Sequence, residues 1–143
     1  MPKIQSAFPQ EPQLSAAQKE SLLNSAKAAL LRSYAPYSKI QVGAAVLTEA
    51  GATYSGCNVE NASYGLTNCA ERSAIFTAVA AEGNKMRIRA IAIWSNLQGL
   101  CAPCGACRQV IFEFGPNAIV LFQGQDGVQE IPASKLLPFG FVL

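Results

Sequence analysis

Apolar residues at helical spacing predict a helix near the start of the chain. These positions recur with helical period at Leu22, Leu23, Ala26 and Leu30. Ser15 and Gln18 stand in front of them at capping-box spacing, so a hydroxyl and an amide can each satisfy a backbone N–H at the helix start. Pro36 cannot continue the helix, and residues 34–38 are typical of a turn. We therefore expect a helix that begins near Ser15 and ends before this turn.

Two strands joined by a tight turn are predicted next. The segment from Ile40 to Thr48 is almost continuously apolar in its middle, which predicts a strand buried on both faces. Residues 49–51, Glu-Ala-Gly, are typical of a hairpin turn, and Ala52 to Cys57 follows as the second strand.

Helices and strands alternate in the rest of the chain. The Ala-rich segment from Cys69 to Glu82 and the core-facing segment from Cys104 to Phe114 predict helices, each followed by a glycine. The runs that predict strands are 89–95, which alternates, 118–122 and 128–131. A short helix is expected after Pro132.

This order of elements predicts an α/β fold, with a single mixed β-sheet of about five strands sandwiched by helices. A chain of 143 residues, half of them apolar, is most simply one domain with a sizeable core. Residues 1–13 are rich in Pro and Gln, and we expect a flexible tail there. Residues 14–143 then form the folded domain.

Charge and composition exclude several classes of partner. The formal net charge is +2 and the eleven Lys and Arg are scattered, so no basic patch for nucleic acid is indicated. Arg87 and Arg89 alternate with apolar residues, as on the polar face of a strand. No segment is apolar enough to span a bilayer, and the N-terminus lacks the apolar core of a signal peptide. Five cysteines cannot all pair within one chain, which favours a reducing, cytoplasmic location.

Candidate chemistry is concentrated in two segments, Cys69-Ala70-Glu71 and Pro103-Cys104-Gly105-Ala106-Cys107. Each falls at the predicted start of a helix, where the helix dipole favours thiolate over thiol. Three cysteines would leave one zinc position open, as in catalytic sites. The chain has no histidine, so sulfur or oxygen must hold any zinc. Glu71 is then the leading proton carrier, two residues after a candidate ligand.

Cys101 leaves alternatives open. With Cys104 and Cys107 it forms two overlapping C-x-x-C pairs, and with Cys69 it could complete a closed, four-cysteine structural zinc module without enzymatic activity. A redox pair or buried, unreactive cysteines are further interpretations of the same spacing.

The two segments match the zinc deaminase pattern H-x-E followed by P-C-x-x-C, with Cys as the first ligand. Further matching motifs are Asn58-Val59-Glu60-Asn61-Ala62, Tyr37-Ser38-Lys39 with Val42-Gly43-Ala44, and Leu136-Leu137-Pro138. The chain thus resembles the cytidine deaminase family, in its small, all-cysteine, homotetrameric branch, from about Tyr34 to Phe141. The resemblance implies hydrolytic deamination of cytidine and deoxycytidine in pyrimidine salvage, with one Zn²⁺ per subunit.

The resemblance also implies roles for individual residues. The zinc ligands would be Cys69, Cys104 and Cys107, with Cys57 and Cys101 as spectators. Glu71 would be the catalytic proton shuttle. Substrate-binding positions would be Asn58 and Glu60 at the ribose 3′-hydroxyl, and backbone groups of Ala70 and Cys104 at the pyrimidine. Ala62, Tyr64 and Phe141 would reach the site of a neighbouring subunit of the tetramer.

Two further expectations concern single residues. Zinc with three thiolates carries a net negative charge, and we expect Arg72 to offset it by hydrogen-bonding a ligand sulfur. Ile40 occupies the position where the family commonly has Phe against the pyrimidine. Losing an aromatic contact costs about 0.5–1.5 kcal/mol. Ile40 therefore keeps open an alternative substrate, a modified cytosine nucleoside or nucleoside antibiotic.

Overall fold

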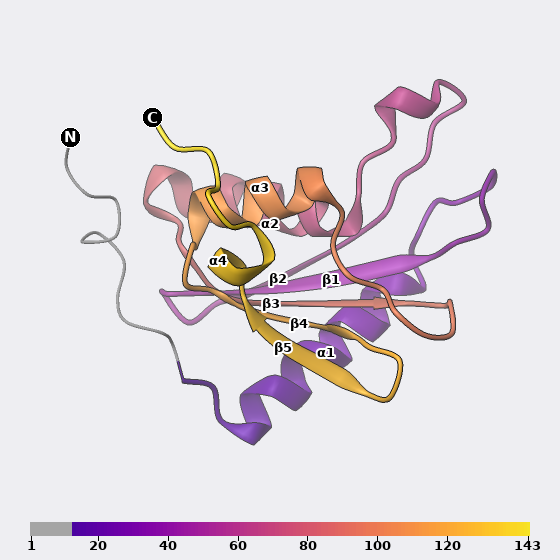
Figure 1. Ribbon diagram of the computed structural model, residues 1–143. Helices are drawn as coiled ribbons and strands as arrows, with labels where there is room; N and C mark the ends of the chain where they lie inside the picture. Colours follow the sequence, from indigo (N-terminus) through magenta and orange to yellow (C-terminus); the bar gives the residue numbers. More distant parts are fainter. Residues whose placement is uncertain (1–12) are drawn as a thin grey trace.

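The computed structural model describes residues 13–143, and most of the predicted tail, residues 1–12, lies outside the described residues (Figure 1). Five strands form one mixed sheet in the order β2-β1-β3-β4-β5. They are β1 (Val42–Thr48), β2 (Thr53–Cys57), β3 (Ile88–Ser95), β4 (Ile119–Gln123) and β5 (Val128–Pro132). The α-helices are α1 (Ala16–Leu30), α2 (Ala70–Glu82), α3 (Gly105–Phe114) and α4 (Ala133–Leu136). Two 3₁₀ turns, η2 (Tyr64–Leu66) and η3 (Gly83–Lys85), flank α2.

The pairing of the strands confirms the predicted mixed sheet. All neighbouring strands are antiparallel except β3 and β4, which are parallel. A parallel pair needs a crossover connection, and α3 lies within the segment that links these two strands. The predicted hairpin of β1 and β2 is confirmed, with Gly43 opposite Cys57 at its open end.

Helices cover both faces of the sheet, with α1 on one face and α2, α3 and α4 on the other (Figure 1). The hydrophobic core therefore consists of two clusters, one on each face of the sheet. The larger cluster includes Ile75 of α2, Ile91 of β3 and Ile111 of α3. The smaller cluster joins Leu22 and Ala26 of α1 to the opposite face of the sheet.

Two glycines let helices lie directly on the sheet. A Cβ at Gly43 would stand 2.0 Å from the carbonyl oxygen of Ala26 in α1. On the other face, a Cβ at Gly56 would stand 2.4 Å from the backbone nitrogen of Ala74 in α2. Because real Cβ atoms do not approach backbone this closely, both contacts depend on the missing side chain.

Helix ends follow the sequence signals. The capping box of Ser15 and Gln18 is present at the start of α1. Cys69 is the N-cap of α2 and Cys104 is the N-cap of α3, so both candidate zinc segments lie at helix starts as predicted. Gly83 ends α2 with a positive φ of 79°. No helix within residues 13–143 combines the length and the apolar character needed to cross a membrane.

The polar alternation expected at Arg87 and Arg89 is present only at the start of β3, and the strand itself is confirmed. Arg87 is exposed and lies just before the strand, while six of the eight strand residues are buried. The reason is position, since β3 lies between β1 and β4 and helices cover both sides of the sheet. Arg89 is half-buried in the strand and donates from Nη2 to the carbonyl oxygen of Gln13 at 3.0 Å.

Candidate active site and metal centre

Three cysteine sulfurs meet where the N-termini of α2 and α3 converge. The Sγ atoms of Cys69, Cys104 and Cys107 all lie within 4.8 Å of one another. The Sγ atoms of Cys69 and Cys104, the two N-cap residues, are 4.0 Å apart. Cys107, one turn further into α3, is fully buried. Both helices direct the positive ends of their dipoles at the cluster, which favours negative charge there.

The cluster fits a zinc ion. Two sulfurs that are each about 2.3 Å from a tetrahedral zinc ion lie about 3.8 Å apart, close to the 4.0 Å between Cys69 and Cys104. Thiolate sulfur is also a preferred zinc ligand. Zinc is therefore bound here by a three-cysteine site. Within residues 13–143, Cys57 and Cys101 are not part of the group, so the closed four-cysteine module is not formed.

Arg72 contacts the cluster from the first turn of α2. Its Nη2 donates to Cys69 Sγ at 3.2 Å, which is the contact that the charge argument requires. Its Nε is buried and has no hydrogen-bond partner within residues 13–143. Hydrogen bonds from Cys107, and then from Arg72, lower the pKa of Cys69 to about 5 in spite of burial. Cys69 is thus a thiolate at neutral pH, ready to bind a metal cation.

Glu71 lies beside the sulfurs and is only 5% exposed. The thiol of Cys107 donates to its Oε2 at 3.2 Å. Burial raises the pKa of Glu71 above its ordinary value. A carboxyl group with a raised pKa is suited to exchange protons near neutral pH.

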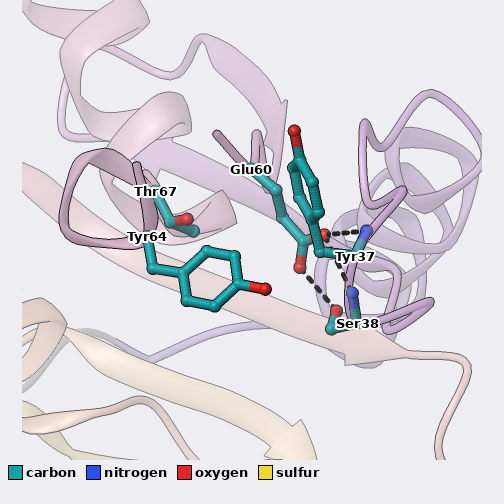
Figure 2. Close-up of a pocket in the computed structure, with 5 residues that line it drawn as sticks. All are labelled: Tyr37, Ser38, Glu60, Tyr64 and Thr67. Carbon is teal, nitrogen blue, oxygen red and sulfur yellow. Dashed lines mark hydrogen bonds between the residues drawn. The ribbon is translucent and has the colours of Figure 1, made fainter. Parts of the chain in front are cut away.

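The structure also holds a cavity of about 300 Å³ (Figure 2). It is lined by Tyr37, Ser38, Glu60, Tyr64 and Thr67. The rings of Tyr37 and Tyr64 meet edge to face, with their centroids 5.7 Å apart. Thr67 stands two residues before Cys69, so a short piece of backbone connects the cavity wall to the first zinc ligand.

Glu60 is fixed within the cavity by the residues opposite it (Figure 2). Its Oε1 accepts from the backbone N–H groups of Tyr37 at 2.9 Å and Ser38 at 3.1 Å. Its Oε2 accepts from the Ser38 hydroxyl at 2.5 Å. The hydrogen bond from the Ser38 side chain is the main cause that lowers the pKa of Glu60, so this carboxylate is charged at neutral pH.

Asn58 is largely occupied by structural contacts. Its Oδ1 accepts from the backbone N–H of Val42 at 2.9 Å and from the hydroxyl of Ser33. Its Nδ2 donates to the carbonyl oxygen of Ile40 at 2.8 Å. One N–H of the amide therefore stays available, because Nδ2 carries two hydrogens and makes one bond to the described residues.

The other residues named from the sequence divide into two groups. Ala70 is fully buried next to Cys69, and Ile40 is half-buried in the segment that Asn58 holds. By contrast, Ala62, Tyr64 and Phe141 are exposed, the last two with 74% and 67% of their surface open. In one chain the structure thus places these three at the surface.

Sequence reasoning missed several residues. Ser38 and Thr67 line the cavity, Asn96 bonds the segment around Ile40, and Gln109 bonds the backbone of Phe141. Ser38 had a usable signal, because it belongs to a recognised motif and stands one residue after Tyr37. Asn96 and Gln109 act over long sequence separations and carry no local signal.

Residues 16–123 match the family profile described as the zinc-binding region of cytidine and deoxycytidylate deaminases. The chain is 45% identical over 124 residues to a cytidine deaminase of Sporosarcina psychrophila, across 85% of this chain and 90% of that protein. It is 46% identical over 125 residues to a cytidine deaminase of Halalkalibacterium halodurans, across 86% and 93%. A crystal structure of cytidine deaminase from Burkholderia pseudomallei matches with a TM-score of 0.80 and 47% identity, over 90% of this chain and 100% of that chain.

Proposed function

The chain belongs to the cytidine and deoxycytidylate deaminase family, and we propose that its zinc centre, together with the cavity that Glu60 lines, deaminates both cytidine and deoxycytidine. The enzyme is a cytidine deaminase, a hydrolase that replaces the 4-amino group of the base and releases ammonia. The observation that carries this function is the buried Glu71 carboxyl beside three clustered sulfurs.

Glu71 is the proton carrier in this proposal. Zinc bound by the three sulfurs supplies a Lewis acid that makes water reactive toward C4 of the pyrimidine near neutral pH. Glu71 accepts the proton that this water gives up and donates it to N3 of the ring. Glu71 then takes the proton of the new C4 hydroxyl and passes it to the amino group, which leaves as ammonia while the C4 carbonyl forms. Burial serves both steps, because a raised pKa brings the carboxyl group closer to neutral pH, where it can both take and give a proton.

Glu60 and Asn58 hold the sugar at the 3′-hydroxyl. Three of the roughly four acceptor positions of the Glu60 carboxylate are used by Tyr37 and Ser38, which leaves one for the ribose. Asn58 contributes its remaining N–H. Both cytidine and deoxycytidine carry a 3′-hydroxyl, so this pair accepts either sugar. Backbone groups of Ala70 and Cys104 bind the pyrimidine edge.

Arg72 offsets the charge of the three thiolates. Its hydrogen bond to Cys69 Sγ at 3.2 Å withdraws negative charge from one ligand. A less negative centre acts as a stronger Lewis acid, so the Arg72 contact supports activation of water by the metal.

The active enzyme is a homotetramer with shared sites. Ala62 and Tyr64 reach the 5′-hydroxyl in a neighbouring subunit, and Phe141 closes over its base. In support, Tyr64, Leu66 and Phe141 expose 74%, 70% and 67% of their surface in the single chain. A partner subunit would cover these side chains, of which Tyr64 and Leu66 both belong to η2. Zinc binding requires reduced cysteines, which favours a cytoplasmic location. The biological role in this proposal is the salvage of pyrimidines.

The function is tested by the change in ultraviolet absorbance when the purified protein acts on cytidine, deoxycytidine or cytosine. The zinc content of the same protein is measured alongside. Both nucleosides should react and the free base, which lacks the sugar that Glu60 binds, should react poorly. Glu71→Gln should keep zinc and lower kcat by about 10²–10⁴-fold. Turnover by Glu71→Gln at the parent rate would refute the role of the carboxylate.

Two cysteine variants separate the catalytic centre from a structural zinc module. Cys107→Ser removes a ligand, and we expect loss of both zinc and activity. Cys101→Ser changes a half-buried cysteine outside the cluster and should preserve both. If Cys101→Ser lost zinc as Cys107→Ser does, the three-ligand assignment would fail.

A further inference from the structure

The segment of residues 37–42 connects the cavity to β1. Its first two residues line the cavity, and their N–H groups are held by Glu60. Its last N–H, that of Val42, is held by Asn58. Between these fixed ends lies Ile40, the residue assigned to the pyrimidine in the proposed function. The N–H of Ile40 donates to Ser38 Oγ at 3.0 Å and its carbonyl oxygen accepts from Asn58 Nδ2 at 2.8 Å. The direction of its side chain then depends on what holds the neighbouring residues Lys39 and Gln41.

Asn96, the first residue after β3, holds that middle part. Its Oδ1 accepts from the backbone N–H of Gln41 at 3.0 Å, and its Nδ2 donates to the carbonyl oxygen of Lys39 at 3.1 Å. Its own backbone N–H donates to the carbonyl oxygen of Gln41 at 3.1 Å. The three bonds fall on the residues directly before and after Ile40, so they bracket it.

Lys39 explains why the segment needs this support. Its φ is 62°, in the left-handed region that side chains with a Cβ disfavour. Such a conformation persists only where the surroundings hold it in place. The backbone N–H of Lys39 bonds the carbonyl oxygen of Ala35 at 3.1 Å, and its carbonyl oxygen bonds Asn96. Asn96 is the side chain that fixes the end of Lys39 nearest Ile40.

We propose that Asn96 is a positioning residue for base recognition, which acts by holding the backbone on both sides of residue 40. The inference rests on the proposed function, which assigns Ile40 to the base. Asn96 itself touches neither the zinc ligands nor Glu71 through any hydrogen bond within residues 13–143. Its loss should therefore weaken nucleoside binding and leave the proton transfer at Glu71 intact.

The test compares Asn96→Ala with Asn24→Ala, which alters an exposed asparagine on α1. Asn96→Ala should raise KM for cytidine about three- to thirtyfold, the span of one to two lost hydrogen bonds. Its kcat and zinc content should stay within twofold of the parent, and Asn24→Ala should change neither constant. Asn96→Asp keeps the acceptor for the Gln41 N–H but sets a carboxylate oxygen against the Lys39 carbonyl oxygen, so it should raise KM at least as much as Asn96→Ala and serves if that variant folds poorly.

A second background shows whether Asn96 acts through residue 40. In Ile40→Ala, the side chain that Asn96 positions is already removed, so adding Asn96→Ala should raise KM by less than twofold. The same increase in both backgrounds would overturn the proposal, because it would mean a general structural effect. An unchanged KM in Asn96→Ala would overturn it as well.

Amide hydrogen exchange tests the role of Asn96 independently of the proposed function. Exchange at residues 39–42 needs no turnover, and it should become at least tenfold faster in Asn96→Ala than in Asn24→Ala. Absence of cytidine turnover by the zinc-loaded parent would refute the function, while unchanged exchange at these residues would refute the role of Asn96.

Discussion

The side chain of Gln109 is paired with the backbone of Phe141 by two hydrogen bonds. Gln109 Nε2 donates to the carbonyl oxygen of Phe141 at 3.0 Å, and the N–H of Phe141 donates to Gln109 Oε1 at 3.2 Å. Gln109 stands two residues after Cys107 on α3. The helix that supplies two zinc ligands therefore also fixes the segment whose aromatic residue we assign to a neighbouring site.

Gln109→Ala should loosen this C-terminal segment and weaken nucleoside binding. Each lost hydrogen bond costs about 0.5–1.5 kcal/mol and two are lost, so we expect KM for cytidine to rise at least about fivefold with kcat little changed. Glu113→Ala, an exposed change on the same helix, is the control and should match the parent. If Phe141→Ala raised KM while Gln109→Ala did not, the pairing would be irrelevant to substrate binding.

Removing the Arg72 guanidinium should impair the metal centre. A hydrogen bond to a charged group is worth about 1.5–3 kcal/mol, and residues that support metal ligands typically change affinity or activity by about 10–100-fold. We therefore expect Arg72→Ala to lose one to two orders of magnitude in kcat/KM or in zinc affinity. Arg72→Gln, which keeps an N–H donor without the charge, should retain more. Titration with a chelator and steady-state kinetics measure the two effects separately, and parent-like values for both variants would contradict the assignment.

Gly56→Ala should destabilise the packing of α2 against the sheet. The new Cβ would stand 2.4 Å from the backbone nitrogen of Ala74, which cannot move aside as a flexible side chain could. Overpacking of this kind costs about 1–3 kcal/mol. Gly65→Ala is the matched control, since its Cβ would meet nothing within 4 Å and its φ is not positive. Chemical denaturation at one fixed protein and zinc concentration should separate the two variants, and equal midpoints would show that the sheet and α2 can move apart at little cost.

Substrate binding should tolerate moderate acid as long as Ser38 is present. The Ser38 hydroxyl is the main cause that lowers the pKa of Glu60, so the carboxylate stays ionised below its ordinary titration range. The carboxylate can accept the hydrogen bond of the ribose hydroxyl only while it is ionised. That hydrogen bond is therefore complete well above the pKa of Glu60 and is lost as pH falls through it. In Ser38→Ala the loss should begin at a higher pH.

The measurement is KM for cytidine as a function of pH between neutrality and about pH 4, a range that spans the ordinary pKa of Glu. Thr67→Ala is the control, because Thr67 lines the same cavity and makes no hydrogen bond to Glu60. An acid limb at the same pH in Ser38→Ala and the parent would rule out Ser38 as the cause.

Local signals in the sequence predicted the elements and the metal centre. The Ser15 capping box fixed the start of α1, and the cysteine spacing predicted that Cys104 and Cys107 lie on one helical turn. These features depend on residues three or four positions apart, whose relation is set by helix geometry. That Cys69 joins them from the start of a different helix was predicted from the two helix starts, and the family pattern agreed with it.

Features that depend on tertiary context were not predicted. Asn96 lies 55 and 57 residues from its partners Gln41 and Lys39. The left-handed Lys39 carries no glycine signal, because its conformation is imposed by those distant bonds. The buried character of β3 likewise follows from its central place in the sheet.

The two metal-binding N-caps leave both helices without the usual oxygen cap. Neither Cys69 nor Cys104 makes a side-chain hydrogen bond to the N–H groups of its helix. Serine or aspartate at such positions would anchor the first turn independently of any ion. With sulfur there, removal of the ion frees the two caps and lets α2 and α3 fray together. Scarcity of zinc in the cell would then erode the folded population of this enzyme along with its turnover.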